Sequence, residues 1–273
     1  MPITIKTTKD IALIREGGRL LAGILHELVE AARPGISTGE LDAIAERRIK
    51  AASGAPAFKG YRAKGSRAVF PATICTSIND EAVHGIPRPD RILAVGDIVG
   101  IDIGMRWPEM TSKEKRVKSK EKERTGLYTD MAVTIGIGRI APEAEKLLRI
   151  TAEALEIGIR AARPGGHTGD IGHAVQQHLK KHHYGIIRNL AGHGVGYELH
   201  EEPLIPNYGA PGTGAELKPG LVIAIEPMAT IGDWRVRLDR DGWTFKTADH
   251  SLAAHFEKTI AVTKNGVEVL TPF

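Results

Sequence analysis

The sequence feature that most constrains the fold is an internal repeat. Residues 31–50 (AARPGISTGELDAIAERRIK) align without gaps on residues 161–180 (AARPGGHTGDIGHAVQQHLK), and eight of the twenty aligned residues are identical. In both copies a helix stop at Pro-Gly is followed by a helix start. Because only two copies exist, the repeat predicts one α/β domain (1–273) of two related halves, about 8–138 and 139–271, and not a solenoid.

Hydrophobic spacing predicts helices on both sides of each stop. Apolar residues step by three or four from Ile11 to Ala32, and Ser37 with Glu40 forms a capping box for the next helix. The second half should hold the corresponding helices, near 142–162 and 168–183. Segments that mix β-branched residues with alternation predict strands at 72–78, 97–105, 128–138, 221–231, 243–247 and 253–270, the last broken by a turn at 264–266.

Composition places the chain among intracellular enzymes. Hydrophobic residues make up 42% of the chain, which is enough for one large core or two small ones. Cys75 is the single cysteine, so no internal disulfide and no cysteine-ligated zinc cluster can form. The charged N-terminus lacks the apolar core of a signal peptide, and no apolar run approaches the roughly 20 residues of a membrane span. We therefore expect a cytoplasmic protein that does not bind membranes.

Four acidic residues lie in segments that otherwise predict apolar strands. Asp102 (VGIDIGM) and Asp130 (LYTDMAV) belong to a predicted hairpin of the first half, and Glu226 (VIAIEPM) and Glu257 (HFEKTIAV) to strands of the second. The separations 226 − 102 = 124 and 257 − 130 = 127 are close to the repeat offset of 130. A carboxylate in an apolar strand is costly unless it is paired or bound to a cation. A salt bridge could explain one of them, but four acids cannot neutralise one another, so they predict a shared metal.

Histidines near these acids extend the predicted site. His193 lies between glycines in AGHGVG, His200 follows in ELHEEP, and His84 precedes the strand of Asp102. A glycine on either side should let the backbone at His193 pass close to a metal or substrate. One histidine among oxygen donors suits Mn, Fe, Co or Zn. The remaining histidines that we considered are more typical of satisfied surface or core residues: His26, His178, His182, His183 and His250.

The order of six motifs is specific enough to identify a family resemblance. NDEAVHGIP, GDIVGIDIG, YTDMAVT, AGHGVGYELHEEP, IAIEPM and HFEKT together resemble the type I methionine aminopeptidases, over a region from about Thr8 to Leu270. The resemblance implies the pita-bread fold, whose pseudo-twofold halves surround a central antiparallel sheet. It also implies an enzyme that removes the initiator methionine from nascent polypeptides when the second residue is small.

The resemblance further implies a centre of two divalent ions, drawn from Co, Mn, Fe or Zn. Asp130 and Glu257 would bridge both ions, Asp102 would complete one site, and His193 with Glu226 the other. Two metal ions about 3.5–4 Å apart lower the pKa of a water molecule towards ~7, which provides hydroxide to attack the peptide carbonyl.

The resemblance assigns His84 and His200 to substrate binding and to stabilisation of the transition state. It also implies a methionine pocket whose lining residues are Phe58, Tyr61, Phe70, Cys75, Leu199 and Trp243. Each of these six could instead be an ordinary core residue. Cys75 fits an apolar wall better than a nucleophile, because no metal-independent triad is visible.

The chain departs from the family pattern in two inserts and two substitutions. The inserts are expected at about 62–69 and 106–126, and the substitutions place His255 where glutamine is usual and Lys258 where histidine is usual. Neither substitution removes a predicted ligand. A long insert at a hairpin tip adds little closure entropy, since each doubling of a loop costs only about 0.6 kcal/mol.

The second insert concentrates positive charge. Between Lys113 and Arg124 stand seven basic and three acidic residues, so this run accounts for the whole net charge of +4. Such a run is usually a solvated loop. The alternative is a patch that contacts nucleic acid, and because the predicted substrates emerge from the ribosome, we hypothesise contact with ribosomal RNA. Apart from this contact, we expect the protein to be a monomer.

Two other functions are compatible with the same fold. Proline-specific aminopeptidases and dipeptidases usually carry a large additional N-terminal domain, and here the first core helix begins near Thr8. A non-catalytic binding module would have lost ligands, whereas all five predicted ligands are present. Both observations favour the methionine-specific enzyme.

Overall fold

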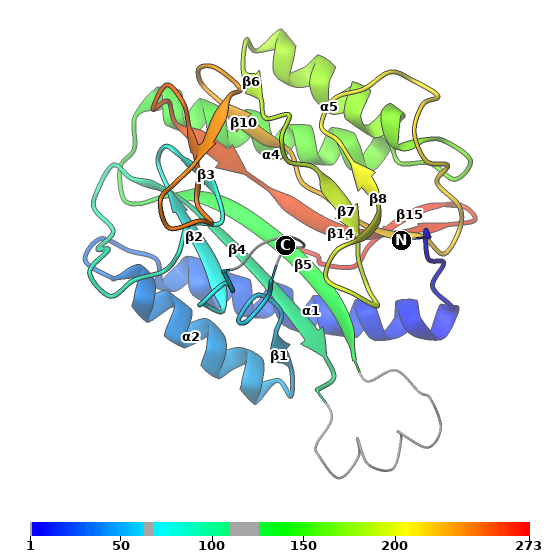
Figure 1. Ribbon diagram of the computed structural model, residues 1–273, viewed down its shortest axis with the longest axis horizontal. Helices are drawn as coiled ribbons and strands as arrows, with labels where there is room; N and C mark the ends of the chain where they lie inside the picture. Colours follow the sequence, from blue (N-terminus) through cyan, green and yellow to red (C-terminus); the bar gives the residue numbers. More distant parts are fainter. Residues whose placement is uncertain (1, 63–67, 110–125) are drawn as a thin grey trace.

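The computed structural model describes residues 2–62, 68–109 and 126–273 (Figure 1). Within them lie four α-helices and an antiparallel sheet, which confirms the predicted fold class. The helices are α1 (Thr8–Ala31), α2 (Thr38–Ala51), α4 (Pro142–Ala161) and α5 (Thr168–Lys181). The strands are β1 (Ala55–Pro56), β2 (Ile74–Ile78), β3 (Glu81–Val83), β4 (Ile98–Trp107), β5 (Leu127–Gly136), β6 (Gly185–Ile186), β7 (Gly192–Gly194), β8 (Glu201–Ile205), β9 (Val222–Ile225), β10 (Met228–Thr230), β11 (Val236–Leu238), β12 (Phe245–Thr247), β13 (Ala253–His255), β14 (Glu257–Thr263) and β15 (Gly266–Val269).

Capping residues or a proline stand at the N-termini of three of the described helices. The predicted capping box of α2 is present, because Ser37 accepts from the Glu40 N–H and the Glu40 carboxylate accepts from the Ser37 N–H. Helix α1 has the same arrangement between Thr7 and Asp10. Helix α4 opens with Pro142, whose fixed φ suits the first helical position. None of the described helices combines enough length with enough apolar character to cross a membrane.

The central sheet has nine strands and antiparallel pairings. Its order is β1-β4-β5-β14-β9-β7-β8, with β2 added on β4 and β15 on β14. Strands β4 and β5 form the predicted hairpin. Two small three-stranded sheets, β13-β10-β6 and β11-β12-β3, are separate from it. Figure 1 shows α1 and α2 beside one part of the central sheet and α4 and α5 beside the other.

One face of the central sheet packs on the helices, and this leaves the other face for chemistry. On β4, Ile101 and Ile103 share a buried cluster with Leu25 of α1 and Leu41 of α2. Strands β9 and β14 share an equivalent cluster with α4 and α5. Side chains alternate between the faces of a strand, so Asp102, which lies between the two isoleucines, points away from the helices.

The two copies of the sequence repeat have matching backbone geometry. Gly35 has a φ of 94° and Gly165 a φ of 79°, in the left-handed region that favours glycine. The N–H of Gly35 donates to the carbonyl of Leu93 at 2.8 Å, and that of Gly165 to the carbonyl of Leu217 at 2.9 Å. Each turn between the paired helices is therefore held by an equivalent later segment.

Candidate active site

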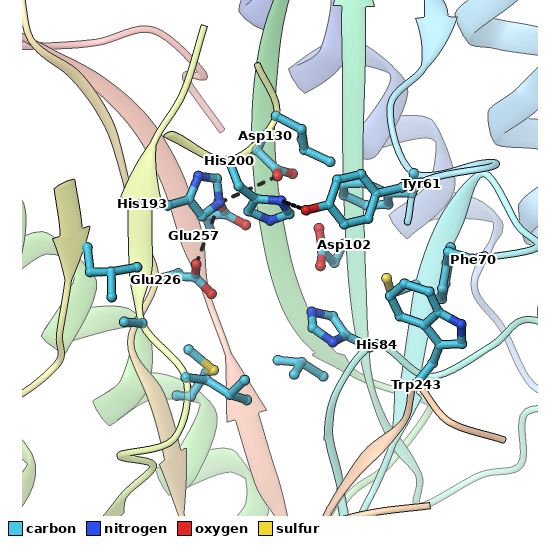
Figure 2. Close-up of a pocket in the computed structure, with 18 of the residues that line it drawn as sticks. Tyr61, Phe70, His84, Asp102, Asp130, His193, His200, Glu226, Trp243 and Glu257 are labelled. Carbon is cyan, nitrogen blue, oxygen red and sulfur yellow. Dashed lines mark hydrogen bonds and ion pairs between the residues drawn. The ribbon is translucent and has the colours of Figure 1, made fainter. Parts of the chain in front are cut away.

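The sheet register brings three of the predicted acidic ligands onto one face. Asp102 of β4 lies opposite Ala132 of β5, and Asp130 lies opposite Gly104. Glu257 at the start of β14 also lies opposite Ala132. Residues directly opposite each other in an antiparallel pair project to the same side. The carboxylates of β4, β5 and β14 therefore converge on the face that the helices leave open (Figure 2).

His193 and Glu226 approach these acids from the second half. His193 is the middle residue of β7, and Glu226 follows the last residue of β9. Nε2 of His193 lies 3.9 Å from Oδ2 of Asp130 and 3.8 Å from Oε1 of Glu226. Asp130, His193 and Glu257 each offer a ligand atom, and these atoms lie within 4.8 Å of one another. The five predicted ligands therefore meet at one place.

The tautomer of His193 can be deduced from its other contact. Its Nδ1 lies 2.9 Å from the carbonyl oxygen of Gly194, which can only accept a hydrogen bond. A neutral ring must therefore carry its proton on Nδ1, and the lone pair of Nε2 faces Asp130 and Glu226. A lone pair directed at two carboxylates is unfavourable without a cation between them.

The buried acids need positive charge for the same reason. One oxygen each of Asp102, Asp130 and Glu257 is buried and has no hydrogen-bond donor in the described part of the chain. Burial raises the pKa of all three carboxyls, and mutual repulsion with Glu226 raises them further. The donor set, oxygen atoms with one imidazole nitrogen, fits a divalent ion such as Mn, Fe, Co or Zn.

His84 and His200 line the same cavity as the acids, and Figure 2 shows both rings near them. Burial lowers the pKa of His84 to about 4, despite the attraction of Glu226. His84 also has a φ of 61°, a conformation that non-glycine residues rarely adopt outside constrained sites. Desolvation by the cavity walls lowers the pKa of His200, and His193 lowers it further. Both rings are therefore neutral near pH 7, with one N–H available as a donor.

A cavity of about 390 Å³ is lined both by these acids and by a group of apolar and aromatic side chains. Phe58 and Phe70 pack edge to face at 6.4 Å between ring centroids, and Phe70 and Trp243 at 5.3 Å. Cys75 is buried, which raises the pKa of its thiol well above the usual value, so the thiol stays protonated. All six residues predicted for the methionine pocket line this cavity: Phe58, Tyr61, Phe70, Cys75, Leu199 and Trp243.

Comparison with known proteins gives the family. Metallopeptidase family M24 matches residues 12–119 and 122–264. A methionine aminopeptidase of Clostridium acetobutylicum is 41% identical over 269 residues, covering 98% of this chain and 98% of the relative. Methionine aminopeptidase 1 of Bacillus subtilis is 42% identical over 269 residues, covering 98% and 99%. The chain belongs to the methionine aminopeptidases of family M24. The predicted resemblance is thereby confirmed.

Solved structures agree with this membership. The crystal structure of the methionine aminopeptidase from Thermotoga maritima matches with a TM-score of 0.88 and 38% identity, covering 100% of both chains. The prolidase from Pyrococcus horikoshii matches with a TM-score of 0.73 and 23% identity, covering 98% of this chain and 63% of that one. The second match shows the fold alone, and the prolidase chain is considerably longer.

In this methionine aminopeptidase the glycines beside His193 have a role in strand packing. A Cβ on Gly192 would lie 2.4 Å from the carbonyl oxygen of Ala224, and one on Gly194 would lie 2.4 Å from that of Glu202. The glycines therefore allow β7 to approach its neighbouring strands closely. The prediction that the backbone at His193 passes close to a metal or substrate stays a prediction.

The sequence did not identify His255 as a member of the site. It is buried, and its Nε2 lies 3.3 Å from Oε2 of Glu226. Thr134 holds its backbone, because the hydroxyl donates to the His255 carbonyl at 2.7 Å and accepts from the His255 N–H at 2.9 Å. The sequence did contain a signal for this residue, namely its position two residues before the predicted ligand Glu257. Alternate residues of an extended chain face the same side, so His255 should face the same side as Glu257.

Proposed function

We propose that this methionine aminopeptidase removes the N-terminal methionine of nascent polypeptides whose second residue is small. The observation that carries the proposal is the junction of two environments in one cavity. A cluster of buried acids and His193 lies at one end, and the aromatic pocket around Phe70 and Trp243 at the other. A methionine side chain suits such a pocket, because its thioether packs favourably against aromatic rings.

We propose further that Asp102, Asp130, His193, Glu226 and Glu257 hold two divalent ions. Oxygen donors and one imidazole fit Co, Mn, Fe or Zn and leave the choice among them open. When bound, such ions lower the pKa of water and polarise the scissile carbonyl.

The chain's own residues would orient the substrate. His84 and His200 would donate hydrogen bonds to the oxygen that gains charge during hydrolysis, a contribution of about 10²–10³ in rate for one donor. The hydroxyl of Tyr61 lies 2.7 Å from Nδ1 of His200 and thereby fixes the orientation of its ring. The cavity walls, Phe58 and Leu199 among them, would bind the methionine side chain and exclude water from it.

Metal analysis with peptide assays tests the proposal. The metal-loaded protein should hydrolyse Met-Ala-Ser and leave Ala-Pro peptides intact, and chelation should abolish the activity. Cleavage of Ala-Pro alone would indicate a proline-specific enzyme. If the protein bound no metal and hydrolysed neither peptide, the result would indicate a binding module.

We also propose the domain organisation and the setting of the enzyme. The matched turns at Gly35 and Gly165 support one domain of two halves, about 8–138 and 139–271. Nascent polypeptides as substrates fit an enzyme of the cytoplasm, and we propose that it acts there as a monomer. Sedimentation analysis of the purified protein tests the monomeric state.

The basic run between Lys113 and Arg124 lies outside the described residues, as do most of the two expected inserts at 62–69 and 106–126. It follows β4 and precedes β5, the hairpin that carries Asp102 and Asp130. We propose from its charge that it contacts ribosomal RNA. Deleting 109–126 should then weaken ribosome co-sedimentation at low salt and leave tripeptide kcat/KM unchanged. Equal co-sedimentation across a salt series would show a solvated loop.

A further inference from the structure

Helices α4 and α5 carry a cluster of histidine and carboxylate side chains apart from the active site. His178 and His182 stand four residues apart on α5 and at its end, so they project from one face. Glu153 of α4 lies against them, and one ligand atom from each of the three residues lies within 4.8 Å of the others. We propose that Glu153, His178 and His182 form a second metal site, which binds zinc or another borderline divalent ion.

The distance between His178 and Glu153 favours a shared ion over a direct hydrogen bond. Nε2 of His178 lies 3.4 Å from Oε2 of Glu153. This nitrogen is hidden from solvent, yet it makes no hydrogen bond within the described part of the chain. Two atoms that are both about 2.0–2.1 Å from one tetrahedral zinc ion lie about 3.4 Å apart. The observed spacing is therefore the one that two zinc ligands have.

The third proposed ligand, His182, comes from the same helix end as His178. The rings of His178 and His182 meet edge to face, with their centroids 5.0 Å apart. Two histidines and one carboxylate are a known zinc donor set, which leaves a fourth position for water. No thiolate takes part, so nickel and copper are competing ions.

The remaining contact of Glu153 is compatible with the site. Its Oε1 accepts from Nη1 of Arg149 at 2.8 Å, which leaves Oε2 for the ion. Lysines 146 and 181 lie close enough to His182 to repel a cation. These charges predict weaker binding than in the acid-rich active site.

The cluster is separate from the proposed catalytic centre. Helices α4 and α5 pack on the face of the sheet opposite to the one that carries the acids. A bound ion would link α4 to α5 and should raise the melting temperature of the protein without occupying the cavity.

Zinc binding to the tag-free, full-length protein tests the proposal. Equilibrium dialysis should show one zinc ion fewer per chain for the variant H178A/H182A than for wild type, and the same loss for Glu153→Gln, which retains the shape of the side chain. His26→Ala is the matched control, because His26 also contacts a glutamate four residues away, Glu30 at 3.5 Å, on an exposed helix surface. It should retain the wild-type stoichiometry.

A variant of the catalytic centre separates this site from the proposed function. D130A/E257A should lose the active-site ions and keep the zinc ion at α4 and α5. Unchanged zinc stoichiometry in both H178A/H182A and Glu153→Gln would overturn the second site. If D130A/E257A instead kept every ion, the proposed catalytic centre would fail while the second site stood. Circular dichroism of each variant verifies that it folds.

Discussion

A buried ion pair joins the N-terminal segment to the strand that follows His200. Nζ of Lys6 lies 2.6 Å from Oε2 of Glu201, and their side chains are 0% and 4% exposed. The other carboxylate oxygen of Glu201 accepts from the N–H groups of Tyr197 at 2.6 Å and Glu198 at 2.9 Å. The pair therefore stabilises the loop that carries Leu199 and His200 into the cavity.

Replacing Lys6 by methionine removes the charge and keeps most of the volume. Breaking a buried pair leaves the carboxylate uncompensated and typically costs 3–5 kcal/mol. Two N–H donors and the Thr4 hydroxyl remain on Glu201, so we expect the lower limit, about 3 kcal/mol. With an unfolding entropy of about 2.1 cal/mol/K per residue, this corresponds to a melting temperature lower by about 5 °C for a chain of this length.

Calorimetry or urea unfolding of Lys6→Met measures this loss. The matched control is Lys50→Met, since Lys50 pairs with Glu46 at 2.7 Å but is 65% exposed. We expect it to lose no more than about 0.5 kcal/mol. Adding Glu201→Gln to Lys6→Met should recover part of the stability, because the buried charge is then gone. Equal effects of Lys6→Met and Lys50→Met would refute the reasoning.

The pair also predicts how the difference depends on pH. Burial raises the pKa of Glu201, but hydrogen bonds from Lys6 and Thr4 more than offset this, so the pKa is lowered in the folded protein. A lowered carboxyl pKa contributes stability that is complete above the unfolded value, near 4.5, and is lost as the pH falls through the folded value. The gap between wild type and Lys6→Met should therefore be large at pH 7 and shrink on acidification.

Three further predictions concern the active site. Asp130→Ala and Glu257→Ala should each abolish activity on a methionyl tripeptide and reduce bound metal; two retained ions with near-normal kcat in either variant would contradict their assignment as bridging ligands. His84→Ala and His200→Ala should lower kcat by about 10²–10³ with metal retained, and a parallel loss of metal would instead make that histidine a ligand. His255→Leu should weaken metal affinity by about 10–100-fold in calorimetry. His255→Gln, which introduces the residue usual in the family, should preserve the affinity. Equal metal affinities of His255→Leu and wild type would show that the contact with Glu226 has no effect.

Local features of the sequence were sufficient for much of the fold. The capping box at Ser37, the stop at Pro34-Gly35 and the strand-borne acids are each encoded within a few residues. Helical and strand periods also show which side chains share a face. These signals predicted the helices and the hairpin that carries Asp102 and Asp130. The predicted ligands were identified with the help of the family motifs, and the sheet register then showed three acids on one face.

Other contacts were decided only by the tertiary structure. Lys6 and Glu201 are 195 positions apart, and no local pattern distinguishes this buried lysine from an exposed one. His255 contacts Glu226 because β13 and β14 pack beside the end of β9, and His178 contacts Glu153 because α5 packs on α4. Local periodicity specifies the direction of a side chain relative to its own element. The partner at the end of that direction depends on how distant elements pack, which is a property of the whole chain.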